Sequence, residues 1–483
     1  MGLLSLQFLL LVSIVIILYR VVPWQSGRVA VLTAANVVFV ASFASFADGP
    51  AALLPFAAYL LQGWICIQAL RVYQSRLALG VAVGWMVCVF IVLKQYSFIQ
   101  PLLEPAHVYV TLGFSYVLFR VLHLMIDTAT GEKIEGLSPL RYFNYTCMFL
   151  SFVSGPIQRY EDYAREETRR DQPRLDGPQF FAVLTRVIIG LIKLVFLAPA
   201  ATTVLEGCLR SMAGAGGLAS GVPEFVQLAT ANLAFVLFLY WNFSGSMDVV
   251  IGAGRAMGFT LPENFNRPLG APNLIDFWTR WHMTLSNWFR VYLFNPTVTF
   301  LTRLHTNVRL APYYGVIGFF VTFFVMGAWH GTTAVIILHG LILGAGVSLN
   351  KFYQIKMRSW LGKKRHLKLN DNYIYTRLSN GLTITVLGVA LACFWLEGSD
   401  LHRLVRTIGY TGLASAFGCS VLLTAIAATF IDGLRWFTAK TRIDQGLAWP
   451  WSRQALVALG LLLLVMYAAL TKSDAPAFVY ATF

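Results

Sequence analysis

Residues 312–350 read PYYGVIGFFVTFFVMGAWHGTTAVIILHGLILGAGVSLN. This stretch contains no Asp, Glu, Lys or Arg, and His330 divides it into apolar runs at 312–329 and 332–350. An α-helix needs about 20 mostly apolar residues to cross a membrane. The two runs therefore predict a pair of membrane-spanning helices with a histidine at their junction.

The rest of the chain has the same character. Of its 483 residues 57% are hydrophobic and only 12% are charged, whereas soluble proteins carry about 25% charged residues. This composition excludes an ordinary soluble enzyme, a disordered protein and a coiled coil. Similar apolar runs occur at 3–19, 29–47, 51–70, 77–94, 107–120, 143–157, 179–205, 223–243, 380–396, 406–431 and 455–470. We expect an all-α, polytopic membrane protein with about 10–13 transmembrane or re-entrant helices.

The formal net charge of +15 indicates orientation rather than nucleic-acid binding. Loops rich in Lys and Arg face the cytoplasm, and the clearest basic segment is 351–377, followed by 435–453 and, less distinctly, 159–174. We expect a multi-pass protein of the cytoplasmic (inner) membrane. Residues 1–470 would form a single domain, with the tail 471–483 on the outer face.

One long segment, 262–309, is too polar to be a span. Within it Arg280, Asn287 and Arg290 lie largely between aromatic and apolar residues. Those residues recur at helical spacing: Trp278, Trp281, Leu285, Trp288 and Tyr292. This pattern is typical of an amphipathic helix that lies in the membrane interface, with its rings at headgroup level. A purely structural surface helix would show the same pattern.

Four histidines in or beside apolar runs are candidate functional residues, because ionisable groups are costly there: His123, His282, His330 and His339. No HxxxH or HExxH spacing pairs them on one helical turn, and the six cysteines form no CxxC pair, so we expect no metal site. A buried histidine stays neutral and can accept a proton. His330, between Trp329 and Gly331, suits a general base, although a structural role alone is the alternative.

Five motifs carry a resemblance to a known family. They are FVSGPIQRY at 152–160, FSGSMDVVIG at 243–252, NFNRP at 264–268, DFWTRWHMTLSNWFR at 276–290 and GAWHG at 327–331. Together they closely resemble the membrane-bound O-acyltransferase family. Within that family they resemble the bacterial branch of the alginate O-acetylation membrane protein and the teichoic-acid D-alanyl exporter. The resemblance covers about residues 107–345.

The resemblance implies an arrangement of helices around a central tunnel and a role for particular residues. His330 matches the family's essential histidine and His282 its second, supporting one. Substrate or donor binding is expected of the other residues in the motifs: Trp281, Trp329, Arg267, Arg280, Arg290, Asn264 and Asp248. Of these, the three arginines could attract donor phosphates, or could simply snorkel to the interface.

The last six residues, FVYATF at 478–483, have the form Phe-x-Tyr-x-x-Phe. This terminus resembles that of the small partner protein of the D-alanylation system, which implies that Tyr480 receives the acyl group. A phenol with a pKa of about 10 is a good leaving group for onward transfer. The alternative is an apolar tail that lies on the membrane surface.

These observations lead to a functional hypothesis, acyl relay across the membrane. The donor would be acyl-CoA or an acylated phosphopantetheine carrier protein on the cytoplasmic side, with no bound cofactor. A secreted or membrane-anchored transferase would take the group from Tyr480 to a cell-envelope or secreted polysaccharide. The alternatives are a lipid or sterol O-acyltransferase and a transporter without chemistry, which would show paired charges within spans or inverted repeats.

Overall fold

A computed structural model describes residues 5–43, 53–94, 96, 113–131, 134–212, 214, 221–305, 307–331, 333–396, 398–441, 454 and 457–463. Over these ranges the secondary structure is helical, without strands, which confirms the all-α prediction. Seven described helices are long and apolar enough to cross a membrane. They lie at Arg76–Lys94, Gly177–Met212, Glu224–Met257, Ala311–Trp329, Val335–Asn370, Tyr373–Phe394 and Leu404–Phe437, and two shorter apolar helices at Gln7–Val21 and Gln25–Ala41. The tail with Tyr480 lies outside the described residues.

The chain divides into two compact units, each described by itself. Unit 1 comprises residues 1–191, 245–263 and 465–483. Its helices are α1 (Leu6–Val21), α2 (Gln25–Ala41), α3 (Leu54–Val72), α4 (Arg76–Lys94), α5 (Phe114–Thr130), α6 (Pro139–Thr146), η3 (Phe149–Ser151), α7 (Tyr160–Thr168) and α8 (Gly177–Ile192). Residues 245–257 at the end of α10 (Glu224–Met257) also belong to it.

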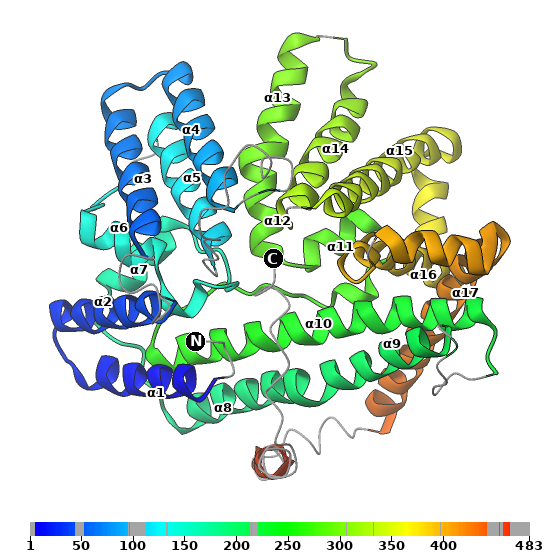
Figure 1. Cartoon of the computed structure of the whole chain (residues 1–483), viewed down its shortest axis with the longest axis horizontal. Helices are drawn as coiled ribbons and strands as arrows, with labels where there is room; N and C mark the ends of the chain where they lie inside the picture. Colours follow the sequence, from blue (N-terminus) through cyan, green and yellow to red (C-terminus); the bar gives the residue numbers. More distant parts are fainter. Residues whose placement is uncertain are drawn as a thin grey trace. The chain divides into compact units, whose positions relative to one another are not determined.

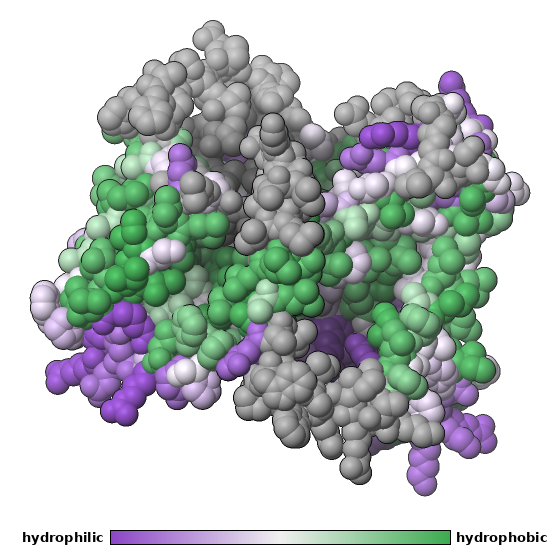
Figure 2. Space-filling view, turned by 90° about the horizontal axis from the view of Figure 1, so that it is seen from below, coloured by the Kyte–Doolittle hydropathy of each residue, from purple (hydrophilic) through white to green (hydrophobic). Residues whose placement is uncertain are grey.

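Unit 2 comprises residues 192–244 and 264–464. It holds η4 (Lys193–Leu197), α9 (Ala198–Met212), the first half of α10, η5 (Pro268–Gly270), α11 (Leu274–Arg280), α12 (Met283–Phe289), η6 (Arg290–Phe294), α13 (Asn295–Leu304), α14 (Ala311–Trp329), α15 (Ala334–Asn370), α16 (Tyr373–Leu391), η7 (Ala392–Phe394) and α17 (Gly398–Thr441). On the face shown in Figure 2, hydrophobic residues form broad continuous areas and hydrophilic residues gather apart from them.

A buried arginine organises the core of unit 1. The guanidinium of Arg120, in α5, is 1% exposed and donates to the carbonyl oxygens of Tyr145, Thr146 and Ser151. These bonds satisfy carbonyls that an interrupted helix would otherwise leave unpaired in the interior. Arg120 thereby holds the chain that enters the 152–160 motif.

The predicted pair of spanning helices is present in unit 2 as α14 and α15, which lie side by side (Figure 1). Their backbones approach closely at two glycines: a Cβ atom on Gly327 would lie 2.2 Å from the Cα of Gly340. Small residues permit such close helix crossings in membrane proteins. The glycines therefore set the position of His330, which directly follows α14.

Two expectations about local structure were wrong. The basic segment 351–377 was expected to be a loop, but α15 continues through it to Asn370 with a kink at Gly362, and α16 starts at Tyr373. Lys, Arg, Leu and Gln favour helix, and no proline interrupts them. The helix expected across 278–292 is instead broken into α11 and α12 at Trp281 and His282, because the loop that begins at Asn264 binds the break.

The same stretch also differs in where its rings lie. The side chains of Trp278, Trp281 and Trp288 are all less than 10% exposed within the protein, and Trp278 packs on Phe323 of α14 with ring centroids 5.0 Å apart. The rings thus contribute to the core of unit 2 rather than to a belt at headgroup level. Helical spacing of aromatic residues does not distinguish a lipid surface from a protein surface.

Candidate active site

The first histidine site is built on the break between α11 and α12. His282 has a left-handed backbone conformation with φ 42°, which is uncommon outside glycine although histidine adopts it more readily than most residues. Two backbone hydrogen bonds hold the break against the loop before α11: Asn266 N–H donates to Arg280 O at 2.8 Å, and Met283 N–H donates to Asn264 O at 3.0 Å. The NFNRP and RWHMT motifs therefore form one structural unit.

The side chain of Asn264 sets the protonation pattern of His282. Its Oδ1 accepts a hydrogen bond from the backbone N–H of Thr284 at 3.1 Å and another from the Thr284 hydroxyl at 2.9 Å. A backbone N–H can only donate, so the amide orientation is fixed. The His282 Nδ1 lies 3.2 Å from the same oxygen. Because an amide oxygen only accepts, Nδ1 must carry the proton of this hydrogen bond. In the neutral ring the lone pair is then on Nε2.

Aromatic rings enclose His282. The ring of Phe243 meets the imidazole edge to face at 4.8 Å, and Trp281 packs against Phe265 at 5.0 Å and on Phe277 at 5.4 Å. Burial among these rings lowers the pKa of His282 to about 3, because the charged form loses its hydration. His282 is therefore neutral at physiological pH, with its lone pair on Nε2.

The second histidine site is built on the turn after α14. His330 caps that helix through a backbone hydrogen bond to Gly327 O and its side chain is buried. Its ring lies 4.8 Å from the ring of Trp329. A Cβ atom on Gly331 would lie 2.8 Å from the side chain of Ile336, so the turn after His330 is closely packed.

Two further rings complete this second site, and one of them, Phe394, was not among the predicted site residues. His339 of α15 and Phe394 of η7 each lie 5.8 Å, ring to ring, from His330. His339 Nδ1 donates to Ala390 O at 2.7 Å, so its Nε2 carries the lone pair in the neutral ring. His339 was a candidate by residue type, but its pairing with His330 depends on the glycine crossing. Phe394 gave no sequence signal.

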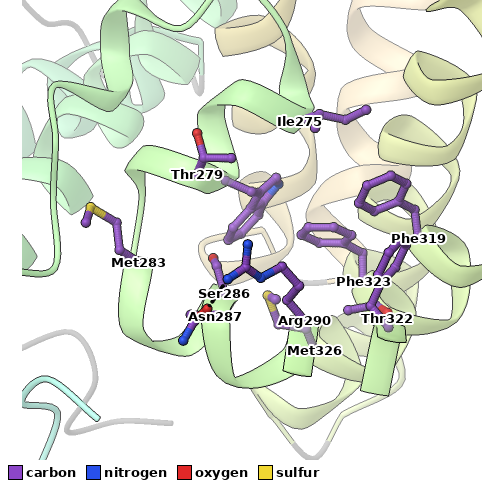
Figure 3. Close-up of a pocket in the computed structure, with 12 residues that line it drawn as sticks. Ile275, Thr279, Met283, Ser286, Asn287, Arg290, Phe319, Thr322, Phe323 and Met326 are labelled. Atoms are coloured by element: carbon purple, nitrogen blue, oxygen red, sulfur yellow. Dashed lines mark hydrogen bonds between the residues drawn. The ribbon is translucent and has the colours of Figure 1, made fainter. Parts of the chain in front are cut away.

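A cavity of about 450 Å³ lies between α11, α12, η6 and α14 (Figure 3). Most of its lining is apolar, and its polar residues come from all four elements: Thr279, Ser286, Asn287, Arg290 and Thr322. Figure 3 shows Phe319 and Phe323 on the α14 side. The lining includes Met283, next to His282, and Met326, one helical turn before His330. His282 and His330 themselves are not among the lining residues.

The predicted donor-binding arginines differ in their surroundings. Arg290 lines the cavity and donates to Asn287 Oδ1 at 2.6 Å. Arg280 pairs with Asp276 of the same helix at 2.8 Å, and Arg267 is exposed. Of the three, Arg290 is the one that the structure places on the cavity wall.

Asp248 belongs to a charged cluster of unit 1. Its Oδ1 accepts from Arg186 Nε at 3.1 Å, and Arg186 forms two further hydrogen bonds with Glu263, each 2.6 Å long. The hydrogen bond with Arg186 lowers the pKa of Glu263. Both Asp248 and Arg186 are mostly buried. The carboxylate of Asp248 therefore pairs with a positive charge from within unit 1.

His123 also has a structural explanation in unit 1. Its Nε2 accepts from Tyr160 N–H at 3.1 Å, and Nδ1 lies 3.2 Å from Asp127 Oδ2. Both ring nitrogens are engaged, and they fix the end of the 152–160 motif. Among the residues that the structure describes, no three His, Cys, Asp or Glu side chains are grouped as metal ligands.

Comparison with known proteins gives a family match over residues 116–376, more than half of the chain, to the membrane-bound O-acyltransferase family. Teichoic acid D-alanyltransferase of Bacillus subtilis (strain 168) is 27% identical over 305 residues, which cover 63% of this chain and 73% of that protein. Probable alginate O-acetylase AlgI of Azotobacter vinelandii is 31% identical over 233 residues, 47% of this chain and 44% of that protein. The chain thus spans less than half the length of this alginate relative.

Proposed function

Because this chain belongs to the membrane-bound O-acyltransferase family, we propose that it moves a small acyl group, acetyl or D-alanyl, across the cytoplasmic membrane. As a family member it is a multi-pass membrane protein and an O-acyltransferase. The relatives named for teichoic-acid D-alanylation and alginate O-acetylation support a cell-envelope or secreted polysaccharide as the final acceptor. The group leaves a cytoplasmic thioester and passes through Tyr480.

The reaction needs a base that is neutral at physiological pH. His330 takes the proton of the Tyr480 hydroxyl as the phenolic oxygen attacks the thioester carbonyl. A C–O bond forms, the C–S bond breaks, and the thiolate leaves with the proton that His330 returns. The proposal is supported chiefly by the burial of His330 among Trp329, His339 and Phe394, because such surroundings disfavour the charged imidazolium.

His282 supports this chemistry from the neighbouring break. Since Asn264 holds its Nδ1 proton, Nε2 can accept a hydrogen bond from the acceptor hydroxyl or from the donor. Phe243 packs on the ring of His282 and helps to hold it in place. We assign His282 the role of orienting the reacting groups.

The donor approaches through the cavity of Figure 3. Its volume of about 450 Å³ falls within the usual range for small-molecule sites, about 300–1,000 Å³. The apolar lining suits a pantetheine arm, and Arg290 suits a phosphate at the end of that arm. Acyl-CoA and an acylated carrier protein share this arm, so either can deliver the acyl group. A secreted or membrane-anchored transferase then unloads the Tyr480 ester on the outer face.

Three variants test the proposal by measuring acyl groups on the envelope polymer of cells that carry equal amounts of protein. His330→Ala removes the base and should lower acylation by a factor of about 100 or more. Tyr480→Phe removes the acceptor hydroxyl and should have the same effect. His305→Ala, at an exposed histidine after α13, is the control and should act as the wild type. Full acylation by Tyr480→Phe would contradict the relay.

A further inference from the structure

A second cavity lies in unit 2 at the kink of α15. Gly362 has φ 72° and ψ 162°, outside the helical region, and the kink divides the end of the helix into two segments. The segments enclose a space of about 290 Å³, lined by Lys351, Gln354, Ile355 and Arg358 before the kink and by Lys363, His366, Leu367 and Asn370 after it. A positive φ favours glycine, so the kink is specified by the sequence.

The lining of this cavity is basic. Lys351, Arg358 and Lys363 contribute three formal positive charges, and no lining residue is acidic. The described ion pairs of the chain all use other cations. The amides of Gln354 and Asn370 add neutral donors. Three cations facing one space without a carboxylate repel one another unless an anion lies between them.

A buried polar atom inside the lining also lacks a partner. The Nδ1 of His366 is inaccessible to solvent and makes no hydrogen bond within the described part of the chain. Buried polar groups in folded proteins are nearly always hydrogen-bonded. Because solvent does not reach this nitrogen, it does not face the open space, and the ligand is indicated by the positive charge of the lining, which favours a group rich in acceptor oxygens.

The surroundings indicate where this ligand comes from. Residues 351–370 contain seven Lys or Arg and no Asp or Glu, directly after the apolar span. Among them and at the start of α16, Trp360 is 79% exposed and Tyr373 is 52% exposed. Exposed tryptophan and tyrosine beside basic residues are typical of the membrane interface. The cavity therefore opens where the headgroups of the bilayer lie.

From these observations we propose that the kink cavity of α15 binds the phosphate of an anionic phospholipid headgroup. A space of about 290 Å³ is at the small end of ligand sites, so it suits a glycerophosphate headgroup better than a whole nucleotide. Basic pockets beside membrane helices recognise anionic headgroups by this chemistry. A bound headgroup would bridge the two helical segments and fix their angle. This site is independent of the acyl-transfer residues.

The test compares two triple variants of the full-length purified protein. Lys351→Gln, Arg358→Gln and Lys363→Gln together neutralise the cavity, whereas Lys364→Gln, Arg365→Gln and Lys368→Gln remove the same charge from exposed positions that do not line it. Native mass spectrometry measures how much phosphatidylglycerol and phosphatidylcholine each protein retains. We expect phosphatidylglycerol binding to fall about tenfold or more in the cavity variant and less than about twofold in the control.

Several outcomes would overturn the proposal. Equal loss in both variants would mean diffuse surface attraction, and equal retention of both lipids by the wild type would mean no headgroup recognition. If inorganic phosphate binds as tightly as the lipid, the site serves a soluble anion. If the cavity variant keeps its lipid but no longer binds an acidic carrier protein, the surface is a protein-docking site. Should the triple variant not fold, His366→Ala and Lys363→Gln replace it, with Lys364→Gln as control.

Discussion

The two histidine sites of unit 2 are held in opposite ways. His282 lies on a break with positive φ, and hydrogen bonds that Asn264 accepts fix both the break and the ring. His330 lies at the end of a regular helix, and glycines and aromatic rings position it. Directional bonds can fix which nitrogen carries the proton, whereas close packing can fix only where the ring lies. The two histidines should therefore respond differently to mutation.

Packing at the His330 site should give the largest loss of stability. Gly327→Ala places a Cβ 2.2 Å from the backbone of Gly340, so α14 and α15 must separate. We expect a cost of about 3 kcal/mol in the free energy of unfolding, measured by denaturant unfolding in detergent. Gly315→Ala, on the same helix, meets only Lys351 Cε at 3.6 Å. That control should be neutral or stabilising, and equal losses in the two variants would contradict the glycine crossing.

Removal of the amide at the His282 site should have an intermediate effect. Asn264→Ala leaves the donors of His282 and Thr284 without their acceptor, at a cost of about 1–3 kcal/mol. Polymer acylation should fall along with stability.

A second substitution separates these two effects. Asn264→Asp keeps an acceptor but places a negative charge beside His282, which favours imidazolium. It should retain more stability than Asn264→Ala, yet lose acylation. Normal acylation by Asn264→Asp would show that the neutral ring is not needed.

The smallest expected effect is a pH dependence of stability. Burial lowers the pKa of His282 to about 3, against about 6.5 in an unfolded chain. Between these values the unfolded state binds more protons, so the stability contribution is complete above about pH 6.5 and is lost as the pH falls. His282→Asn removes the titrating group, keeps an N–H for Asn264 and tolerates φ 42°.

Thermal unfolding between about pH 7 and pH 5 measures this difference. The midpoint of His282→Asn should decline less than that of the wild type, whereas His305→Ala, at an exposed histidine, should follow the wild type. A decline as steep in His282→Asn as in the wild type would contradict a buried, neutral His282.

The fold was predictable where the sequence signal is local. The apolar runs on either side of His330 predict α14 and α15, because an apolar run of about 20 residues is enough to identify a spanning helix. The break at His282 was not predictable in this way, since Asn264 lies 18 positions earlier and only the folded chain joins them. The same holds for His339 and Phe394, which reach His330 through tertiary packing.

Charge patterns were the least reliable guide to local structure. The basic segment 351–377 was predicted to be a loop, but α15 continues through it to Asn370 and several of its basic residues line a cavity. Asp248 was expected to bind substrate or donor, and it lies in an ion-pair cluster with Arg186. A charge in a membrane protein indicates that a partner exists. Whether that partner is a side chain, a lipid or a substrate depends on the fold.

We propose that His330 acts as the base that allows Tyr480 to take the acyl group from the thioester. The most direct measurement is mass spectrometry of the C-terminal peptide from protein isolated from acylating cells. The account predicts an ester on Tyr480 in the wild type, whose added mass identifies acetyl or D-alanyl, and no ester in His330→Ala. Two results together would contradict this proposal. The wild type would acylate its polymer normally, and no ester would be found on Tyr480 when the transferase that unloads it is absent.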